Sequence, residues 1–594
     1  MPKFPEIARH IAILIVGLAV NLQVTLSASA AQIRGPYQNG TLDSLRASSA
    51  STQPPRRSLV ASVLSSFPAP GARRVCWQEE PASPAAKRTA NGVTVADPGL
   101  RRSLGEIQQL IGKGDSAGAR ALLAQALKQF PNEPALYNFM GAVEVQSGNY
   151  QAAELNFQKT VEKSPRYAIA YLNLGRLYQQ HADKIPQAEK KALETYERLL
   201  KFDPENVEAN YQSAFLLQLQ GSFKSSLERL ARLPADAQGI AQALALRCAD
   251  YAGLEERAPA ESAAQELSQR ADLSEANVIS IMPVLEKHHR QDLETKLLAA
   301  LAEHKLASPA ALYRLGVLYE SQQEYPQARE TLEKVSEQQP DAVPPLIELA
   351  RVASNQGDNQ SALGYLAHAR DLQPANAAIH YSFGLICYKE GLPAEAYRSL
   401  KKAVTLEPNN PSYNYAFASV AYERLDPREC IPYFKKYVEL EPGDPGGRLA
   451  LGAAYVHNHD DEQARRILEG VVNTPQIASG AHYFLGLVAH NQGRPDDAVK
   501  ELRQALALQP GFTDGWVEIG LVYLKQKRYP EAEKSLRRAI DLDPESFSAN
   551  LNLMILYQRT KDPRASEQAM RFEKIRADHD EWVKGFKRTI EVLR

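Results

Sequence analysis

The side chains in this sequence that could bind a metal or carry out catalysis are few, and they stand far apart. His288 and His289 adjoin one another, and residues 457–461 read His-Asn-His-Asp-Asp, which includes residue types that hold zinc. The first pair falls at an expected junction between helices, and the second group falls in an expected turn. We interpret the second group as a solvated turn, and we predict no metal site.

Four cysteines, Cys76, Cys248, Cys387 and Cys430, are too few and too scattered for a disulfide framework or a zinc site, and no CxxC pair occurs. Cys387 and Cys430 fall at core positions of a repeating pattern, so we expect packed thiols there. The sequence has neither a glycine-rich phosphate loop nor a GxSxG nucleophile motif. We therefore predict a protein that is not an enzyme, with no catalytic residues, no cofactor and no small-molecule substrate.

The length and charge of the chain narrow its architecture and its partners. With 594 residues it is too long for one compact core, so it either splits into domains or extends by repetition. Hydrophobic residues make up 44% of the chain, charged residues make up 23%, and the mean hydropathy is −0.38. The formal net charge of −1 provides no global field that would attract nucleic acid, so we predict no nucleic-acid partner.

A pattern of small and apolar residues recurs every 34 residues along most of the chain. With Pro309 as position 1, an apolar residue falls at position 7, small residues at positions 8 and 20, and a proline usually at position 32. Apolar residues at helical spacing on both sides of a polar turn predict two helices per repeat. Small residues allow the paired helices to approach closely, and the proline ends the second helix. The position-8 residues of seven consecutive repeats are Gly316, Ala350, Gly384, Ala418, Gly452, Gly486 and Gly520.

These recurring residues resemble the tetratricopeptide repeat (TPR) family over nearly all of residues 100–563. The resemblance implies an all-α fold, a right-handed α-solenoid of helix-turn-helix repeats, with about eleven recognisable units. A capping helix would close the stack, with Phe572, Trp582 and Phe586 facing inward. We expect an N-terminal TPR array over 99–235, divergent helical pairs over 236–308, a C-terminal TPR array over 309–546, and a terminal helix pair with its cap over 547–594.

Residues 1–31 have the pattern of a secretory signal peptide. Lys3 and Arg9 precede an apolar run over residues 11–22, and small residues at 28–30 suit a signal peptidase. Residues 32–98 are rich in Ser, Ala, Pro and Arg and carry a net charge of +4, so we expect a disordered linker. This pattern predicts an exported protein of the periplasm or envelope of a bacterium. The alternative is an uncleaved anchor that would tether the same protein to the membrane.

The TPR resemblance also implies a place for partners, because in this family the first helix of each pair lines the concave surface. Positions 5, 9, 12 and 13 tend to face that surface. Position 5 is often tyrosine here, position 12 is tyrosine twice, and position 9 is small or apolar apart from one arginine. Tyrosine offers a large contact area at a low cost in side-chain entropy. The predicted groove for a protein or peptide partner consists of Tyr313, Arg351, Tyr381, Tyr388, Tyr415, Tyr422 and Tyr483. The competing interpretation is that some position-5 rings only contact the neighbouring helix.

One TPR mechanism holds a peptide's terminal carboxylate with Lys, Asn and Arg at fixed groove positions. Those positions here hold Asn138 and Ala142, then Asn173 and Arg176, then Glu208 and Gln212, so we do not expect this clamp. The sequence therefore predicts a non-enzymatic scaffold that binds protein partners and assembles an envelope, secretion or exopolysaccharide complex. The alternative function is a membrane-tethered regulatory or sensory module.

Overall fold

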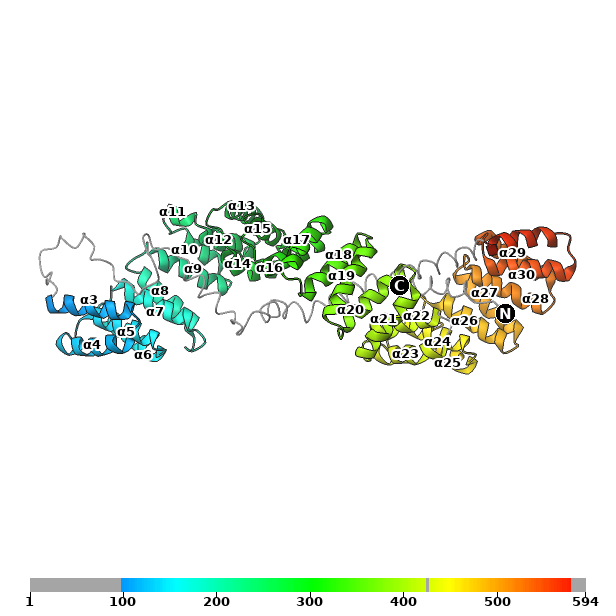
Figure 1. Cartoon of the computed structure of the whole chain (residues 1–594), viewed down its shortest axis with the longest axis horizontal. Helices are drawn as coiled ribbons and strands as arrows, with labels where there is room; N and C mark the ends of the chain where they lie inside the picture. The colour runs from blue at the N-terminus through cyan, green and yellow to red at the C-terminus, as the bar shows by residue number, and fades with distance from the viewer. Residues whose placement is uncertain (1–97, 424–426, 578–594) are drawn as a thin grey trace. The chain divides into compact units, whose positions relative to one another are not determined.

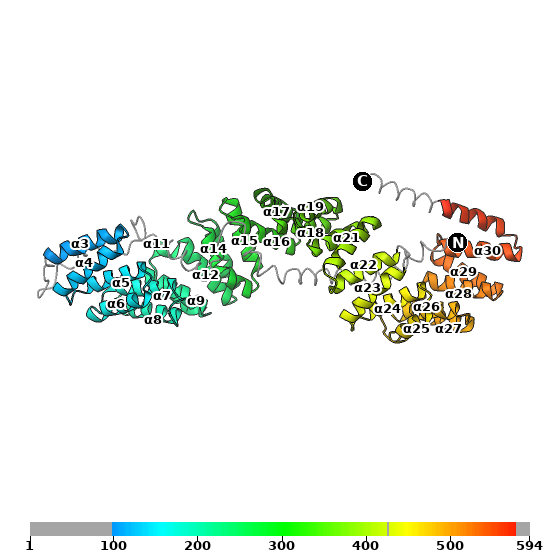
Figure 2. The ribbon, with the colours of Figure 1, turned by 60° about the horizontal axis from the view of Figure 1, so that its bottom comes forward.

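The computed structural model describes residues 98–423 and 427–577, and within these residues every regular element is a helix. The described residues form two compact units, 98–338 and 339–577. In each unit a helix packs against the helices that precede and follow it in the chain (Figure 1, Figure 2). The predicted α-solenoid of paired helices is confirmed. The predicted signal peptide and linker lie outside the described residues.

The helices of the first unit follow one another at intervals of about one repeat per pair. They are α3 (Pro98–Gly112), α4 (Ser116–Gln129), α5 (Pro134–Gln146), α6 (Tyr150–Lys163), α7 (Ala168–Gln180), α8 (Ala188–Leu200), α9 (Val207–Leu219), α10 (Phe223–Leu230), α11 (Ala235–Gln238), α12 (Ala241–Gly253), α13 (Arg257–Ser268), α14 (Glu275–Lys287), α15 (Gln291–Glu303), α16 (Pro309–Ser321) and α17 (Tyr325–Gln338).

The second unit continues the pattern and ends in residues 565–577, which are also helical. Its helices are α18 (Val343–Asn355), α19 (Asn359–Leu372), α20 (Ala377–Lys389), α21 (Pro393–Leu406), α22 (Pro411–Glu423), α23 (Pro427–Leu440), α24 (Pro445–His457), α25 (Asp461–Glu469), α26 (Ala478–Asn491), α27 (Pro495–Leu508), α28 (Thr513–Lys525), α29 (Tyr529–Leu542) and α30 (Phe547–Thr560).

The small residue at position 8 is required because the second helix of the same repeat packs directly on it. A Cβ atom added at Gly384 would lie 2.7 Å from Cγ of Leu400, and one added at Gly175 would lie 2.4 Å from Cζ of Tyr196. Both distances are far inside van der Waals contact, so a larger residue would push the two helices apart. The position-20 alanines are fully buried at the same contact, for example Ala396 and Ala532.

Most terminal prolines also have a role that the spacing alone did not indicate. The backbone carbonyl of each of these prolines accepts a hydrogen bond from the side chain at position 4 of the following repeat, six residues later. Pro340 is the exception, because position 4 of the next repeat is Leu346, which has no side-chain donor. The donor type varies, since Asn414 donates to Pro408 at 2.8 Å and Trp516 Nε1 donates to Pro510 at 3.1 Å. The bond joins consecutive repeats by satisfying a carbonyl at the end of a helix. The same bond is made by Tyr137, Tyr171, Asn210, Arg448 and Asn550, and His380 makes the equivalent contact with Pro374.

The region that breaks the 34-residue frame is helical, as predicted. Helices α12 and α13 pair with one another, and α14 and α15 form a second pair. The preceding repeat is degenerate, because α10 has only eight residues and α11 has four. Alanine and leucine fill the core here in place of the aromatic residues used elsewhere; Ala245, Ala249, Ala264 and Leu297 are almost fully buried. The solenoid therefore continues through the divergent segment of the first unit.

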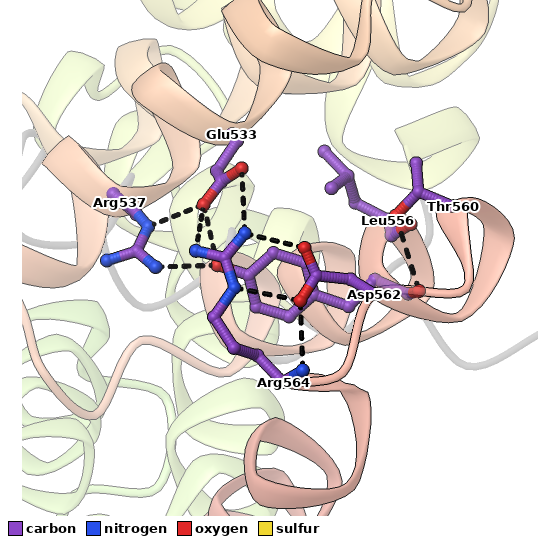
Figure 3. A network of polar contacts seen from close by, with 7 residues as sticks. Glu533, Arg537, Leu556, Thr560, Asp562 and Arg564 are labelled. Carbon is purple, nitrogen blue, oxygen red and sulfur yellow. Dashed lines mark hydrogen bonds and ion pairs between the residues drawn. The ribbon is translucent and has the colours of Figure 1, made fainter.

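A polar network holds the last repeat to the terminal helices (Figure 3). The carboxylate of Glu533 accepts hydrogen bonds from Arg537 Nε at 2.8 Å, Arg564 Nη1 at 2.6 Å and the Tyr557 hydroxyl at 2.8 Å. Arg564 also lies between Glu533 and Asp562, and its guanidinium stacks 4.4 Å from the centre of the Tyr557 ring. Three helical segments, α29, α30 and the one that starts at 565, are thus joined through one carboxylate.

The predicted cap is partly visible in the described residues. Phe572 is buried, and its ring meets that of Phe547 edge to face at 4.9 Å, which confirms its inward orientation. Trp582 and Phe586 lie outside the described residues. Among the described helices, none has both the length and the apolar character needed to cross a membrane. The apolar run over residues 11–22 lies outside the described residues.

Candidate protein-interaction surface

Three of the seven predicted groove residues are buried by the chain itself. Tyr381 is 5% exposed, Tyr422 is 6% exposed and Tyr483 is 1% exposed. The Tyr381 ring packs on Tyr413 at 4.8 Å, and the Tyr483 ring packs on Phe512 at 4.8 Å. Burial raises the pKa of Tyr381 to about 12 and raises the pKa of the other two phenols as well.

These contacts support the competing interpretation of position 5 for Tyr381 and Tyr483. Tyr413 lies on the first helix of the repeat after that of Tyr381, and Phe512 directly precedes the first helix of the repeat after that of Tyr483, so both rings lie at junctions between repeats. Tyr422, from position 12, meets His457 of the next first helix at 5.2 Å in the same way. The expected exposure of these three rings is therefore wrong, because neighbouring repeats cover them. Contact with a partner stays a prediction that would require the repeats to separate.

The other four predicted residues are half-buried and keep part of their surface. Tyr388 donates its hydroxyl proton to Glu423, and Tyr415 packs against Tyr437 of its own repeat at 4.9 Å. Arg351 donates to Glu348 one turn earlier, at 2.9 Å from Nε. Tyr313 lies in the first unit, on α16. The structure thus brings Arg351, Tyr388 and Tyr415 to first helices of one unit and places Tyr313 in the other.

The surface that the first helices of the second unit leave accessible is centred on position 9. We call this set the position-9 row. Most of its members are half-buried apolar residues, whereas position 5 is mainly covered. The row lies on consecutive first helices, each packed on its neighbours through the second helices between them. Its members from α20 to α30 are Leu385, Ser419, Ala453, Leu487, Leu521 and Ile555; only Ala453 is buried.

Two glutamates flank the position-9 row one helical turn away. Glu423 lies four residues after Ser419, and Glu518 lies three residues before Leu521, so each shares a helix face with a member of the row. Burial raises the pKa of Glu423, although the Tyr388 hydroxyl opposes that shift by donating to the carboxylate. Sequence reasoning missed both residues, because it searched the groove for aromatic rings. An isolated acid on an otherwise apolar helix face was the available signal.

The imidazole nearest to Glu518 is that of His490 on α26. Its Nδ1 lies 3.8 Å from the carboxylate, which is too long for a hydrogen bond. Both side chains are recessed, with 16% of His490 and 12% of Glu518 exposed. Within the described residues Nε2 of His490 has no hydrogen-bond partner. A buried polar pair with incomplete hydrogen bonding is costly, and a partner that supplies the missing bonds would stabilise it.

The first helices α5, α7 and α9 of the first unit carry a different surface, built from amides and the Arg176–Glu208 ion pair. Asn173 donates to Asn138 at 3.1 Å, and Arg176 donates through Nε to Glu208 at 2.6 Å. Burial lowers the pKa of Arg176, but Glu208 more than offsets this effect, so the net shift is upward. The positive charge that a carboxylate clamp would use is therefore already occupied by an acid of the next repeat.

The side chains that the sequence offered for catalysis or metal binding have structural surroundings in the fold. Cys387 and Cys430 are buried core thiols, as predicted, and burial raises the pKa of Cys387 to about 12. Thiolate chemistry at neutral pH is disfavoured by such a shift. Across residues 98–423 and 427–577, no three His, Cys, Asp or Glu side chains gather as a metal site would require.

Comparison with known families agrees with this repeat geometry. Tetratricopeptide repeat family models match residues 104–154, 140–207, 347–411 and 483–547, and a second such model matches residues 310–342. The chain is similar to the structure titled APC/C hetero-tetramer Cut9-Hcn1, at 15% identity over 77% of this chain and 95% of that chain, with a TM-score of 0.31. It is also similar to yeast Tom70, at 15% identity over 75% of this chain and 99% of that chain, with a TM-score of 0.28.

A third similar structure is YrrB, described as a TPR protein with an unusual peptide-binding site. It has 21% identity over 37% of this chain and 96% of that chain, with a TM-score of 0.25. The family matches fall in both units and coincide with helix pairs that have small residues at the close contacts. On the strength of these repeat matches, the chain belongs to the tetratricopeptide repeat family.

Proposed function

We propose that this protein is an exported scaffold that binds protein or peptide partners on the position-9 row of its second unit. The TPR fold is typically a non-catalytic protein-interaction scaffold, and the family assignment supports this class of function. The main observation in favour of this binding site is the composition of the position-9 row. It leaves half-buried apolar side chains on one face, whereas the tyrosines beside it are used for packing. Apolar surface flanked by polar groups is typical of a site for a peptide or a partner helix.

The setting that we propose is the bacterial periplasm or envelope, where the scaffold would assemble an envelope, secretion or exopolysaccharide complex. Support comes from the signal-peptide pattern of residues 1–31. The alternative is a regulatory or sensory TPR module that retains residues 11–26 as a membrane anchor. Intact mass of the protein purified from its host separates the two, because a chain starting near residue 31 indicates cleavage and a full-length chain indicates the anchor.

The binding surface is tested by capture of partners from an envelope extract of the native host, followed by crosslinking and mass spectrometry. We expect Leu487→Ser to reduce capture strongly, since it removes an apolar contact from the middle of the position-9 row. Leu508→Ser is the matched control, because Leu508 ends a second helix in the same unit and is 57% exposed. Helical circular dichroism of both variants must match that of the parent chain. Equal capture by the parent and Leu487→Ser would refute this binding surface.

A further inference from the structure

Recessed glutamates in this protein normally have an arginine partner. Glu144 accepts from Arg120 Nε at 2.8 Å, and Glu294 accepts from Arg314 Nη2 at 2.7 Å. The pairs Arg176–Glu208 and Arg351–Glu348 follow the same rule. Because a carboxylate loses much of its hydration when it is recessed, each of these pairs offsets a cost of folding.

Glu423 and Glu518 depart from that rule. Among the described residues Glu423 has the Tyr388 hydroxyl as its hydrogen-bond partner, and no lysine or arginine pairs with it. In the part of the chain that the structure describes, Glu518 is paired with the imidazole of His490 alone, at 3.8 Å. Lys389 on α20 and Lys525 on α28 are exposed, and among the described residues neither forms an ion pair with either glutamate. The position-9 row is thus flanked by two carboxylates that, within residues 98–423 and 427–577, lack the cation found beside their counterparts.

We propose that the position-9 row recognises a peptide segment in which lysine or arginine is interspersed with apolar residues. This inference rests on the proposed binding function and specifies the chemistry of the partner. Leu385, Leu487 and Leu521 contact the apolar side chains, while Glu423 and Glu518 each receive a cation. Charge complementarity supports this choice, because a cation bound at a recessed carboxylate offsets a cost that the unbound protein already bears.

Glutamine is the informative substitution at both carboxylates. Glu423→Gln retains a side-chain oxygen that can accept the Tyr388 hydroxyl, and it removes a recessed negative charge. The variant should therefore fold at least as well as the parent, so a loss of binding cannot be attributed to unfolding. Glu439→Gln is the matched control, since Glu439 ends a second helix in the same unit and its side chain is 68% exposed.

The test uses the full chain and three fluorescein-labelled peptides of equal length, with leucine at the same places and Lys, Gln or Glu between them. Fluorescence anisotropy should show tightest binding to the Leu-Lys peptide and weakest binding to the Leu-Glu peptide. Glu423→Gln and Glu518→Gln should each weaken binding of the Leu-Lys peptide about tenfold and reduce its salt dependence, with little effect on the Leu-Gln peptide. The Glu439→Gln control should bind all three like the parent.

Two results would overturn the inference. The first is that the parent binds the Leu-Lys and Leu-Gln peptides equally. The second is that the control Glu439→Gln loses as much binding of the Leu-Lys peptide as Glu423→Gln does. Capture from the envelope extract distinguishes this failure from failure of the proposed function. If Leu487→Ser abolishes capture while both glutamine variants capture normally, the surface is correct and the cation preference is wrong. If Leu487→Ser also captures normally, the proposed surface itself is wrong.

Discussion

Replacement of Asp250 by asparagine should stabilise this protein at neutral pH and reduce the dependence of its stability on pH. Asp250 lies on α12 and is fully buried, and burial raises the pKa of its carboxyl from 3.8 to about 7. The side chain of Gln218 on α9 donates to Oδ1 at 2.9 Å, which opposes the shift without cancelling it. Within the described residues no lysine or arginine forms an ion pair with this carboxyl.

The sign follows from proton linkage. Between pH 4 and pH 7 the folded protein holds a proton on Asp250 that the unfolded chain has released, so the free energy of unfolding falls as pH rises. The stability associated with this group is fully present below pH 3.8 and is lost as pH rises through about 7. Each unit of pKa difference corresponds to about 1.4 kcal/mol, so this carboxyl accounts for a loss of at most about 4 kcal/mol between those limits.

Asparagine keeps the oxygen that Gln218 binds and has no charge to bury at any pH. Urea unfolding of the parent and Asp250→Asn, followed by circular dichroism at pH 5 and pH 8, measures the effect on the first unit. We expect the variant to gain stability relative to the parent at pH 8 and to gain much less at pH 5. Asp236→Asn is the control, because Asp236 is exposed in the same unit. A variant less stable than the parent at pH 8, or an equal change at both pH values, would refute this reasoning.

Three further substitutions test the contacts between helices and between repeats. Gly175→Ala should destabilise the first unit by about 1–3 kcal/mol in thermal unfolding, because the new Cβ would lie 2.4 Å from the Tyr196 ring. Gly105→Ala is the control: there is open space around Gly105, so this substitution should be neutral or stabilising. Asn414→Leu should lower the free energy of unfolding in urea by about 1–2 kcal/mol, because it removes the donor to the Pro408 carbonyl. Asn414→His should retain most of that free energy, because His380 makes the equivalent contact one repeat earlier. Glu533→Gln should increase hydrogen exchange in residues 547–577 without changing exchange in α20, since it weakens the network that joins the terminal helices; unchanged exchange at 547–577 would contradict this role.

The helices and their pairing could be predicted from the sequence because each is specified by a requirement that only a few residue types meet. A contact between helix axes at Gly384 excludes any side chain, and the same exclusion recurs at Gly452 and Gly486. Likewise, the turns between helices have a left-handed backbone, which favours glycine. Gly148 and Gly357 adopt φ values of 75° and 81° there, although Gln323 and Lys527 adopt the same conformation at the corresponding position. Requirements of this kind leave a periodic signal that one sequence reveals.

The bonds between repeats could not be predicted in this way, because several residue types satisfy the same need. Position 4 holds Asn414 in one repeat, His380 in another and Trp516 in a third, yet each side chain reaches the carbonyl of the preceding terminal proline. A carbonyl requires only a donor at the correct distance, so no single residue type is fixed at this position. Periodicity therefore identifies sites of steric exclusion and overlooks sites of hydrogen bonding.

The same distinction explains why the tyrosines were assigned to the binding surface. From sequence, a ring at position 5 of a first helix suits a binding groove and a contact between repeats equally well. The helix face on which the ring lies does not show which of these two roles it has. The structure distinguishes the two roles: Tyr413, on the next first helix, covers Tyr381, and Phe512, directly before the next first helix, covers Tyr483. Position 9 lies one turn further along the same helix, and most of its residues in the second unit are half-buried.

The two units consequently use their first helices in different ways. In the first unit Asn138, Asn173 and Arg176 bond to one another or to the next repeat, so their polar groups fix the packing of neighbours and leave little bonding capacity for a ligand. In the second unit the corresponding face is apolar, and its carboxylates at Glu423 and Glu518 lack cations among the described residues. Since affinity is gained where a partner completes contacts that the free protein lacks, we expect selectivity for partners to reside in the second unit.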